Sequence, residues 1–288
     1  MEDWSRASWF VVFAGIADAY LWGFDVDRRW RLRHGNPARG SLAILPMRRR
    51  AARASLEDAV WIADCLAFDH DAPVGVSPSA SNRGTRFPHQ PVISLSGHDA
   101  ADWYFDNLLG AFAVAAEIRF GASYCVRYGL EEDRAPGTDF STRFAGREAL
   151  VSLYAMACRQ ADVMTEFLCL YRILEAADRG NGTAFAVAHL DSVAKHDFGV
   201  LRVIPHGRPD EWRNAFDVYR QRALDEMDRL RGARALTPEG IASHLSGLRN
   251  SLAHGRTATR VADFGPDVEE VAAALPIVKL LARMAIEP

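Results

Sequence analysis

Apolar residues recur at helical spacing through the second half of the chain. Between residues 142 and 178 they do so without a proline and with a single early glycine, which predicts one long amphipathic helix. The same spacing predicts helices over residues 210–230, 238–254 and 266–286. Four such helices, joined partly by the strand-like run FGVLRVIP, predict a bundle.

The first half of the chain has short apolar runs of strand length. WFVVFAGI, AYLWGFDVDRRWRLRH and SLAILPM predict strands between residues 9 and 47, with a turn at the Gly, Asn and Pro cluster of residues 35–40. A short helix is expected over residues 55–68, capped by Ser55. The Ser-, Pro- and Gly-rich residues 74–91 predict a long exposed loop. Beyond it, a strand over 91–97, a helix over 100–120 and an extended piece over 122–130 are expected.

The acidic connector EEDRAPGTD, at residues 131–139, separates these two patterns. A chain of 288 residues is near the upper limit for one hydrophobic core, so two packed units are expected. The predicted fold class is α+β, with an N-terminal α+β unit over residues 1–135 and a C-terminal helical domain over residues 136–288.

Composition and charge describe an ordinary folded protein. The chain is 49% hydrophobic and 25% charged, and its formal net charge is -3. This charge argues against a strongly basic surface that coats nucleic acid, but it leaves room for a local basic patch. The start MEDWSRASWFVVFAGIADAY matches neither a secretory signal nor a membrane-spanning helix, so no membrane association is expected.

The cysteines and histidines indicate neither a disulfide framework nor a metal site. The four cysteines have no C-x-x-C spacing. Cys158 and Cys169 are expected on one face of the predicted long helix as buried reduced thiols, which fits a cytoplasmic location. His189, His196 and His206 have no repeated ligand spacing, so no metal and no cofactor are expected.

The stretch LRNSLAHGR, at residues 248–256, combines titratable groups at the end of a predicted helix. A helical wheel at about 100° per residue places an apolar stripe opposite a small, polar face. The stripe is Ile241, Leu245, Leu248 and Leu252, and the opposite face is Ser243, Gly247, Asn250 and His254. Small residues allow another helix to approach closely, so a two-fold related copy would bring two motifs into one cleft.

An Arg and a His in such a cleft suit the cleavage of RNA. His254 can exchange a proton near neutral pH and Arg249 can stabilise charge on a phosphate oxygen, without a metal ion. DNA lacks the 2′-hydroxyl and would be spared. The alternative is structural: His254 would interact with the helix dipole, Asn250 with a loop, and Arg249 with an acid on a neighbouring helix.

LRNSLAHGR resembles the Arg-x4-His signature of HEPN domains, and FLCLYRILE resembles their first-helix pattern. The resemblance implies a dimeric helical domain, which in many members is a metal-independent endoribonuclease and in others a binding module. It implies that Arg249 and His254 are the catalytic pair and that Asn250 positions the phosphate or water. Glu166 and Glu175 are candidates for a supporting acid, although both also fit ordinary helix-surface charges.

The motif together with the tail AALPIVKLLARMAIE is also similar to the methylamine utilization protein MauJ family, which is named from gene neighbourhood. Two functions follow. The first is a cytoplasmic homodimer that cleaves single-stranded RNA in a toxin or antiviral setting. The second is a non-catalytic dimerisation module, with a protein partner bound by the N-terminal unit.

Overall fold

The computed structural model divides the chain into two compact units. The first comprises Met1–Phe112 and Val126–Cys158, and the second comprises Ala113–Cys125 and Arg159–Pro288. The structure describes residues 9–13, 25–27, 29–34, 41–47, 52–71, 73–78, 124–125, 139–160, 162–205, 213–254 and 266–287. The predicted boundary at residue 135 and the expected elements over 91–97 and 100–120 lie outside the described residues.

The first unit contains an antiparallel sheet with the strand order β2-β3-β4-β1-β5. Val11 pairs with Leu42 on one side and with Val76 on the other. The strands are β1 (Trp9–Phe13), β2 (Asp25–Val26), β3 (Trp30–His34), β4 (Ser41–Pro46) and β5 (Val74–Pro78).

Strand β5 occupies residues expected to start the long loop, so that part of the loop prediction is wrong. Val74 and Val76 are buried on either side of the half-buried Gly75. This alternation covers only three residues before a Ser- and Pro-rich stretch begins. The apolar pattern is therefore too short to distinguish a strand from a loop.

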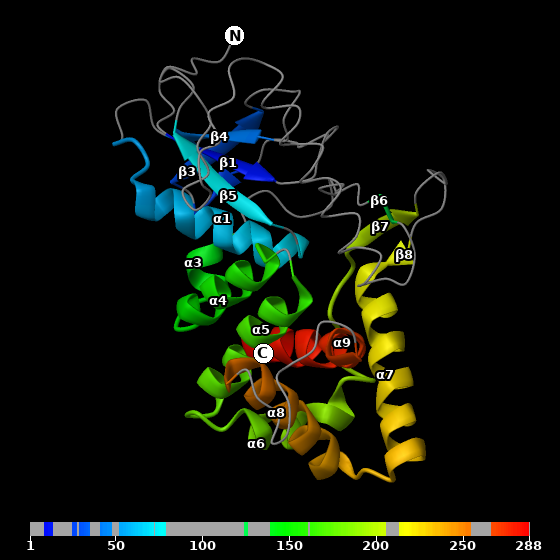
Figure 1. Ribbon diagram of the computed structural model, residues 1–288. Helices are drawn as coiled ribbons and strands as arrows, with labels where there is room; N and C mark the ends of the chain where they lie inside the picture. The colour runs from blue at the N-terminus through cyan, green and yellow to red at the C-terminus, as the bar shows by residue number, and fades with distance from the viewer. Residues whose placement is uncertain are drawn as a thin grey trace, which may run out of the picture. The chain divides into compact units, whose positions relative to one another are not determined.

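Helix α1 (Leu56–His70) packs against β1, β5 and α4 (Figure 1). The predicted cap is confirmed. Ser55 Oγ accepts a hydrogen bond from Asp58 N at 3.0 Å, and Asp58 Oδ2 accepts one from Ser55 N at 3.1 Å. The two bonds form a capping box, which satisfies backbone donors that the first turn leaves without helical partners.

The single long helix expected over residues 142–178 is wrong. The structure has α3 (Phe140–Arg143), α4 (Glu148–Cys158) and α5 (Val163–Ala177) in its place. Gly146 follows α3 with a φ of 76°, a conformation that favours glycine. Before α5, the Asp162 side chain accepts a hydrogen bond from Thr165 N at 2.8 Å and caps the helix.

This break separates Cys158, which ends α4, from Cys169, which lies in α5. The two thiols therefore do not share a helix face as predicted. Both are buried and free, as is Cys65, which confirms the expected burial. Burial, and next the charge of Asp69, raise the pKa of the Cys65 thiol far above its usual range.

Polar contacts join α1 to α3 and α4 inside the first unit. Asp69 forms an ion pair of 2.6 Å with Arg143, and Asp64 accepts a hydrogen bond of 2.7 Å from Ser152. These side chains supply the partners that buried carboxylates need. A third carboxylate, that of Asp71, accepts a hydrogen bond of 2.8 Å from the Tyr154 hydroxyl.

The second unit is mainly helical, as expected for this part of the chain. Helix α9 packs most extensively against α5 and α7, and α6 packs against α5 and α8 (Figure 1). The helices α8 and α9 have the predicted bounds. After α5 the elements are α6 (Gly182–His189), the short 3-10 helix η3 (Leu190–Ser192), α7 (Ala215–Arg234), α8 (Pro238–His254) and α9 (Pro266–Ile286).

A small sheet precedes α7, with β6 (Tyr124–Cys125), β7 (Arg202–Pro205) and β8 (Arg213–Asn214) in the order β6-β7-β8. Strand β7 lies in the run FGVLRVIP, as expected. Helix α7 was predicted to start at residue 210, but it starts at Ala215. Pro209 and Asp210 have the composition of a helix start, but the residue that caps α7 is Asn214.

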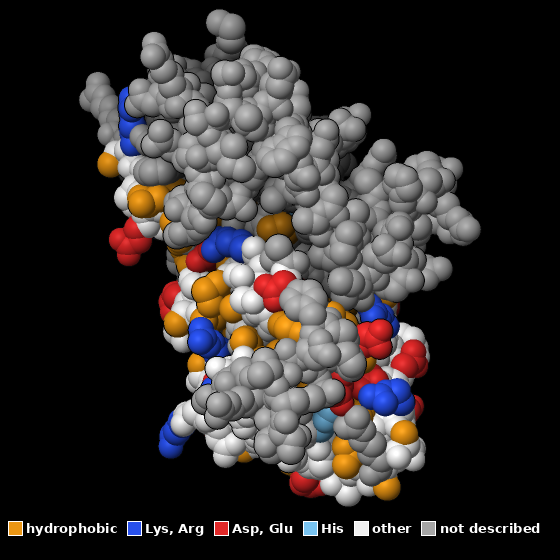
Figure 2. Space-filling model, viewed as in Figure 1, with side chains coloured by type: hydrophobic (Ala, Val, Ile, Leu, Met, Phe, Trp, Pro, Cys, Tyr) orange, Lys and Arg blue, Asp and Glu red, His pale blue; other side chains and the backbone are white. Residues whose placement is uncertain are grey.

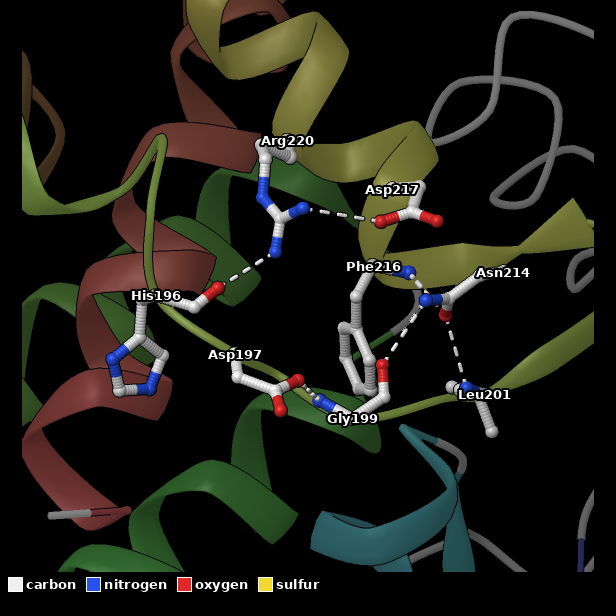
Figure 3. Close-up of polar contacts among 8 residues, drawn as sticks. All are labelled: His196, Asp197, Gly199, Leu201, Asn214, Phe216, Asp217 and Arg220. Carbon is white, nitrogen blue, oxygen red and sulfur yellow. Dashed lines mark hydrogen bonds and ion pairs between the residues drawn. The ribbon is translucent and has the colours of Figure 1, made fainter.

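Asn214 fixes the chain that leads into α7 (Figure 3). Its Oδ1 accepts hydrogen bonds from Phe216 N at 3.2 Å and from Leu201 N at 3.0 Å, and its Nδ2 donates to Gly199 O at 3.0 Å. Arg220, one turn into the helix, donates to His196 O at 2.7 Å. The segment before β7 is therefore held to the start of α7 by side chains of that helix and its cap.

The surface of the described residues carries both signs of charge. In the face shown in Figure 2, acidic and basic side chains are interspersed with apolar ones. In the part of the chain that the structure describes, no helix is both long enough and apolar enough to span a bilayer.

Candidate functional site

Helix α8 carries the Arg-x4-His motif, and local signals define its start. Thr237 Oγ1 accepts a hydrogen bond from Gly240 N at 3.3 Å, and Pro238 occupies the first helical position, where a missing N–H costs nothing. Hydrogen bonds from its own backbone N–H and from the Thr237 side chain hold the pKa of Glu239 below its usual range. An ionised Glu239 suits the positive end of the helix dipole.

The side chains of α8 that the structure describes lie on the two faces that the helical wheel predicts. Ile241 and Leu245 are fully buried, and Leu248 and Leu252 are half-buried. On the other side, a polar strip is exposed to solvent, and a Cβ added at its glycine would meet no atom within 4 Å. This strip comprises Ser243, Gly247 and Asn250.

Arg249 is held by two acceptors. Its Nη2 lies 2.8 Å from Glu175 Oε1, on α5, and its Nη1 donates to Asn250 Oδ1 at 2.9 Å. The side chains of Arg249 and Glu175 keep 28% and 25% of their surface exposed. The structure therefore brings three of the predicted site residues together in a position that solvent reaches.

His254 is the last residue of α8, and its side chain lies outside the described part of the structure. Its backbone position, five residues after Arg249, places it in the same final stretch of the helix. The joint action of Arg249 and His254 on one substrate stays a prediction.

Glu166 lies elsewhere in the second unit. Its Oε1 is 3.0 Å from Nζ of Lys279 on α9, and the two side chains keep only 4% and 1% of their surface exposed. The Lys279 ammonium also lies 5.1 Å from the centre of the Tyr219 ring. Glu166 and Glu175 are nine residues apart, which at about 100° per residue puts them on roughly opposite sides of α5. Glu175 is therefore the acid that contacts the motif.

Sequence reasoning missed α6, whose first residue, Gly182, lies against Glu175. The stretch Arg-Gly-Asn-Gly-Thr, at residues 179–183, contained the signal, because Asn is among the preferred N-cap residues of helices. Asn181 does cap α6, and its Oδ1 accepts a hydrogen bond from Ala184 N at 3.0 Å.

The sequence predicts that three histidines, His189, His196 and His206, form no metal site. The His189 ring lies 4.3 Å from the Phe185 ring, and the His196 ring lies 4.6 Å from the Phe198 ring, while His206 lies outside the described residues. Within the described ranges, no group of three His, Cys, Asp or Glu side chains could hold a metal ion.

Comparison with known proteins gives one family match. The model of the family described as "Methylamine utilization protein MauJ" matches residues 150–287, a range that includes Glu175, Arg249 and His254. No curated protein and no solved structure matches the chain. Residues 150–287, which run from the first turn of α4 to the end of α9, are thus MauJ-like in sequence.

Proposed function

We propose that this protein is a metal-independent endoribonuclease that cleaves single-stranded RNA, and that α5 to α9 form a HEPN-like domain. The observation that carries the proposal is the contact of Arg249 with both Glu175 and Asn250, at the end of the helix that also holds His254. The contact gives the guanidinium a fixed orientation while it stays accessible to solvent.

The proposed reaction uses only groups of the motif. His254 takes the proton from the ribose 2′-hydroxyl, whose oxygen attacks the adjacent phosphorus. The P–O5′ bond breaks as the new P–O2′ bond forms, and a proton returned by a protonated His254 or by water completes the 5′-hydroxyl. The products are a 2′,3′-cyclic phosphate and a 5′-hydroxyl end, and Arg249 stabilises the charge that develops on the phosphate.

Arg249 has N–H groups to spare for this role. A guanidinium has five N–H donors, and one on each terminal nitrogen is directed to Glu175 or Asn250. The remaining donors are available to a phosphate oxygen. Glu175 and Asn250 thereby orient the guanidinium without using its full capacity to bind an anion.

The proposal includes a homodimer through the exposed strip of Ser243, Gly247 and Asn250. The open space around Gly247 allows the backbone of a second helix to approach closely. A two-fold axis at this strip would bring two copies of Arg249 and His254 into one cleft, where a single strand of RNA could bind. The biological setting would be a toxin or antiviral system in the cytoplasm, with residues 1–135 binding a partner.

The second candidate is a non-catalytic dimerisation or interaction module. The observation that favours it is the same ion pair, because Arg249 and Glu175 also connect α8 to α5 as an ordinary structural contact. In this case the motif stabilises the fold, and partners bind other surfaces.

The experiment that separates the two candidates is cleavage of labelled single-stranded RNA in EDTA, with DNA of the same sequence as the substrate control. The proposal expects 2′,3′-cyclic phosphate ends and intact DNA. Arg231 offers a matched control, since it too is an arginine paired with a carboxylate of another element, Asp191 at 3.4 Å. The Arg231→Ala variant should still cleave RNA, and the Arg249→Ala variant should not. Wild-type protein that leaves all RNA intact would rule out the first candidate under these conditions.

A further inference from the structure

The turn between α5 and α6 brings the start of α6 against the residue that holds Arg249. The turn is fixed by backbone hydrogen bonds, from Gly180 N to Glu175 O at 2.7 Å and from Asn181 N to Asp178 O at 2.8 Å. Gly180 has a φ of 95°, so its backbone conformation accounts for a glycine at that position.

Gly182, the first residue of α6, has a different reason to be glycine. Its φ is not among the positive values of the described residues, so its backbone would accept any L-amino acid. The restriction is space. A Cβ added to Gly182 would lie 2.9 Å from Tyr171 Cε1 and 3.2 Å from Glu175 Cγ, and the first distance is shorter than real Cβ contacts.

The Tyr171 ring cannot easily move away from such a Cβ. It keeps 2% of its surface exposed and stacks on the Phe167 ring, with 6.2 Å between the ring centres. Its hydroxyl lies 3.4 Å from Thr183 Oγ1, which ties the ring to α6 itself. Because the ring is held by close packing, a Cβ at Gly182 must displace the start of α6, which also changes the contact of α6 with Glu175 Cγ.

We infer that Gly182 is a positioning residue for Arg249. By letting the start of α6 lie directly on Tyr171 and Glu175, it fixes the Glu175 side chain, whose carboxylate holds the Arg249 guanidinium at 2.8 Å. The consequence for RNA cleavage rests on the proposed function. The coupling between Gly182 and the ion pair does not depend on that function and can be measured without RNA.

The test is Gly182→Ala, with Gly232→Ala as the matched control. Gly232 is an exposed glycine of α7, and a Cβ there would meet no atom within 4 Å. The readout is NMR of the full chain labelled with 15N-arginine, in which the Nη resonances of Arg249 are assigned by their loss in Arg249→Lys. An ion-paired guanidinium rotates slowly and protects its Nη protons from exchange with water.

We expect Gly182→Ala and Glu175→Gln each to reduce this protection by about tenfold, the scale of a lost charge-assisted hydrogen bond. Gly232→Ala should keep it. A Tyr171→Leu change in the Gly182→Ala protein removes the ring atoms that the added Cβ would meet, so it should restore part of the protection, while the contact of 3.2 Å with Glu175 Cγ remains. Folded Gly182→Ala protein with wild-type protection of Arg249 would overturn the inference.

If Gly182→Ala does not fold, the Tyr171→Leu, Gly182→Ala double variant is compared with Tyr171→Leu alone. Weaker protection of Arg249 in the double variant than in Tyr171→Leu supports the inference, and equal protection in the two overturns it. RNA cleavage is measured on the same samples. Loss of protection in Gly182→Ala from a wild type that cleaves no RNA would refute the ribonuclease proposal and leave the positioning role of Gly182 standing.

Discussion

Glu175 on α5 and Arg249 on α8 form an ion pair of 2.8 Å that links the two helices at the Arg-x4-His motif. Both side chains are partly exposed, so the pair should contribute modestly to stability. We expect a coupling of about 0.5–1 kcal/mol in the free energy of unfolding. A double-mutant cycle of Glu175→Gln and Arg249→Met in urea measures it, and the coupling should shrink in high salt.

Loss of either member of the catalytic pair should abolish RNA cleavage without unfolding the protein. His254→Ala and Arg249→Ala should each lower the cleavage rate by about a hundredfold or more, because proton transfer and charge stabilisation each contribute on that scale. Melting temperature is recorded on the same samples. If the motif is structural, both variants will instead lose about 1–2 kcal/mol of stability, and the wild type will have no activity to lose.

Substitution at Gly247 should dissociate the proposed dimer. Gly247→Trp places a large side chain where the second helix would approach, and its Cβ would meet no atom of the described protomer within 4 Å. Sedimentation should then show monomers, while Gly232→Trp, at another open helical glycine, should leave the dimer unchanged. A dimer that tolerates Gly247→Trp would place the interface on another surface.

The buried ion pair of Glu166 and Lys279 should be costly to break from one side. Lys279→Met would leave the carboxylate without its cation in the interior, at a cost of about 3–5 kcal/mol. The Glu166→Leu, Lys279→Met double variant should be more stable than the single variant, because neither charge of this pair stays buried. The free energies of unfolding of both variants are measured in urea, with Arg231→Met as a control for an arginine on the surface.

Cys65 should resist thiol reagents in the native protein. Burial, followed by the negative charge of Asp69, raises the pKa of its thiol, so the reactive thiolate stays rare well into the alkaline range. The modified cysteine is identified by peptide mass spectrometry. The rate of modification of Cys65 by the reagent should not rise between about pH 7 and pH 9. In urea, which unfolds the protein, Cys65 should react rapidly.

Local signals explain which elements could be predicted from the sequence. The Ser55 cap, the Thr237-Pro238 start of α8 and the bounds of α9 depend on neighbours within a turn or two, and all agree with the structure. The apolar spacing of the sequence continues across the helix breaks at Gly146 and before Asp162, so this pattern alone did not reveal them.

Tertiary contacts explain the rest of the candidate site. The motif itself was visible, but its acid partner depends on how α5 packs against α8. Helix periodicity could have shown that Glu166 and Glu175 face different neighbours. It could not have shown which of the two faces Arg249, nor that α6 packs beside it.

The position of Lys279 opposite Glu166 also determines how α9 is aligned along α5. A slide of α9 by one turn would move Lys279 by about 5.4 Å along the helix axis. Most side chains of α9 are buried and apolar, and apolar contact is not directional, whereas such a slide would break the ion pair of 3.0 Å between Lys279 and Glu166. Apolar contact alone is compatible with several alignments of α9 along α5, and this ion pair therefore favours the alignment observed.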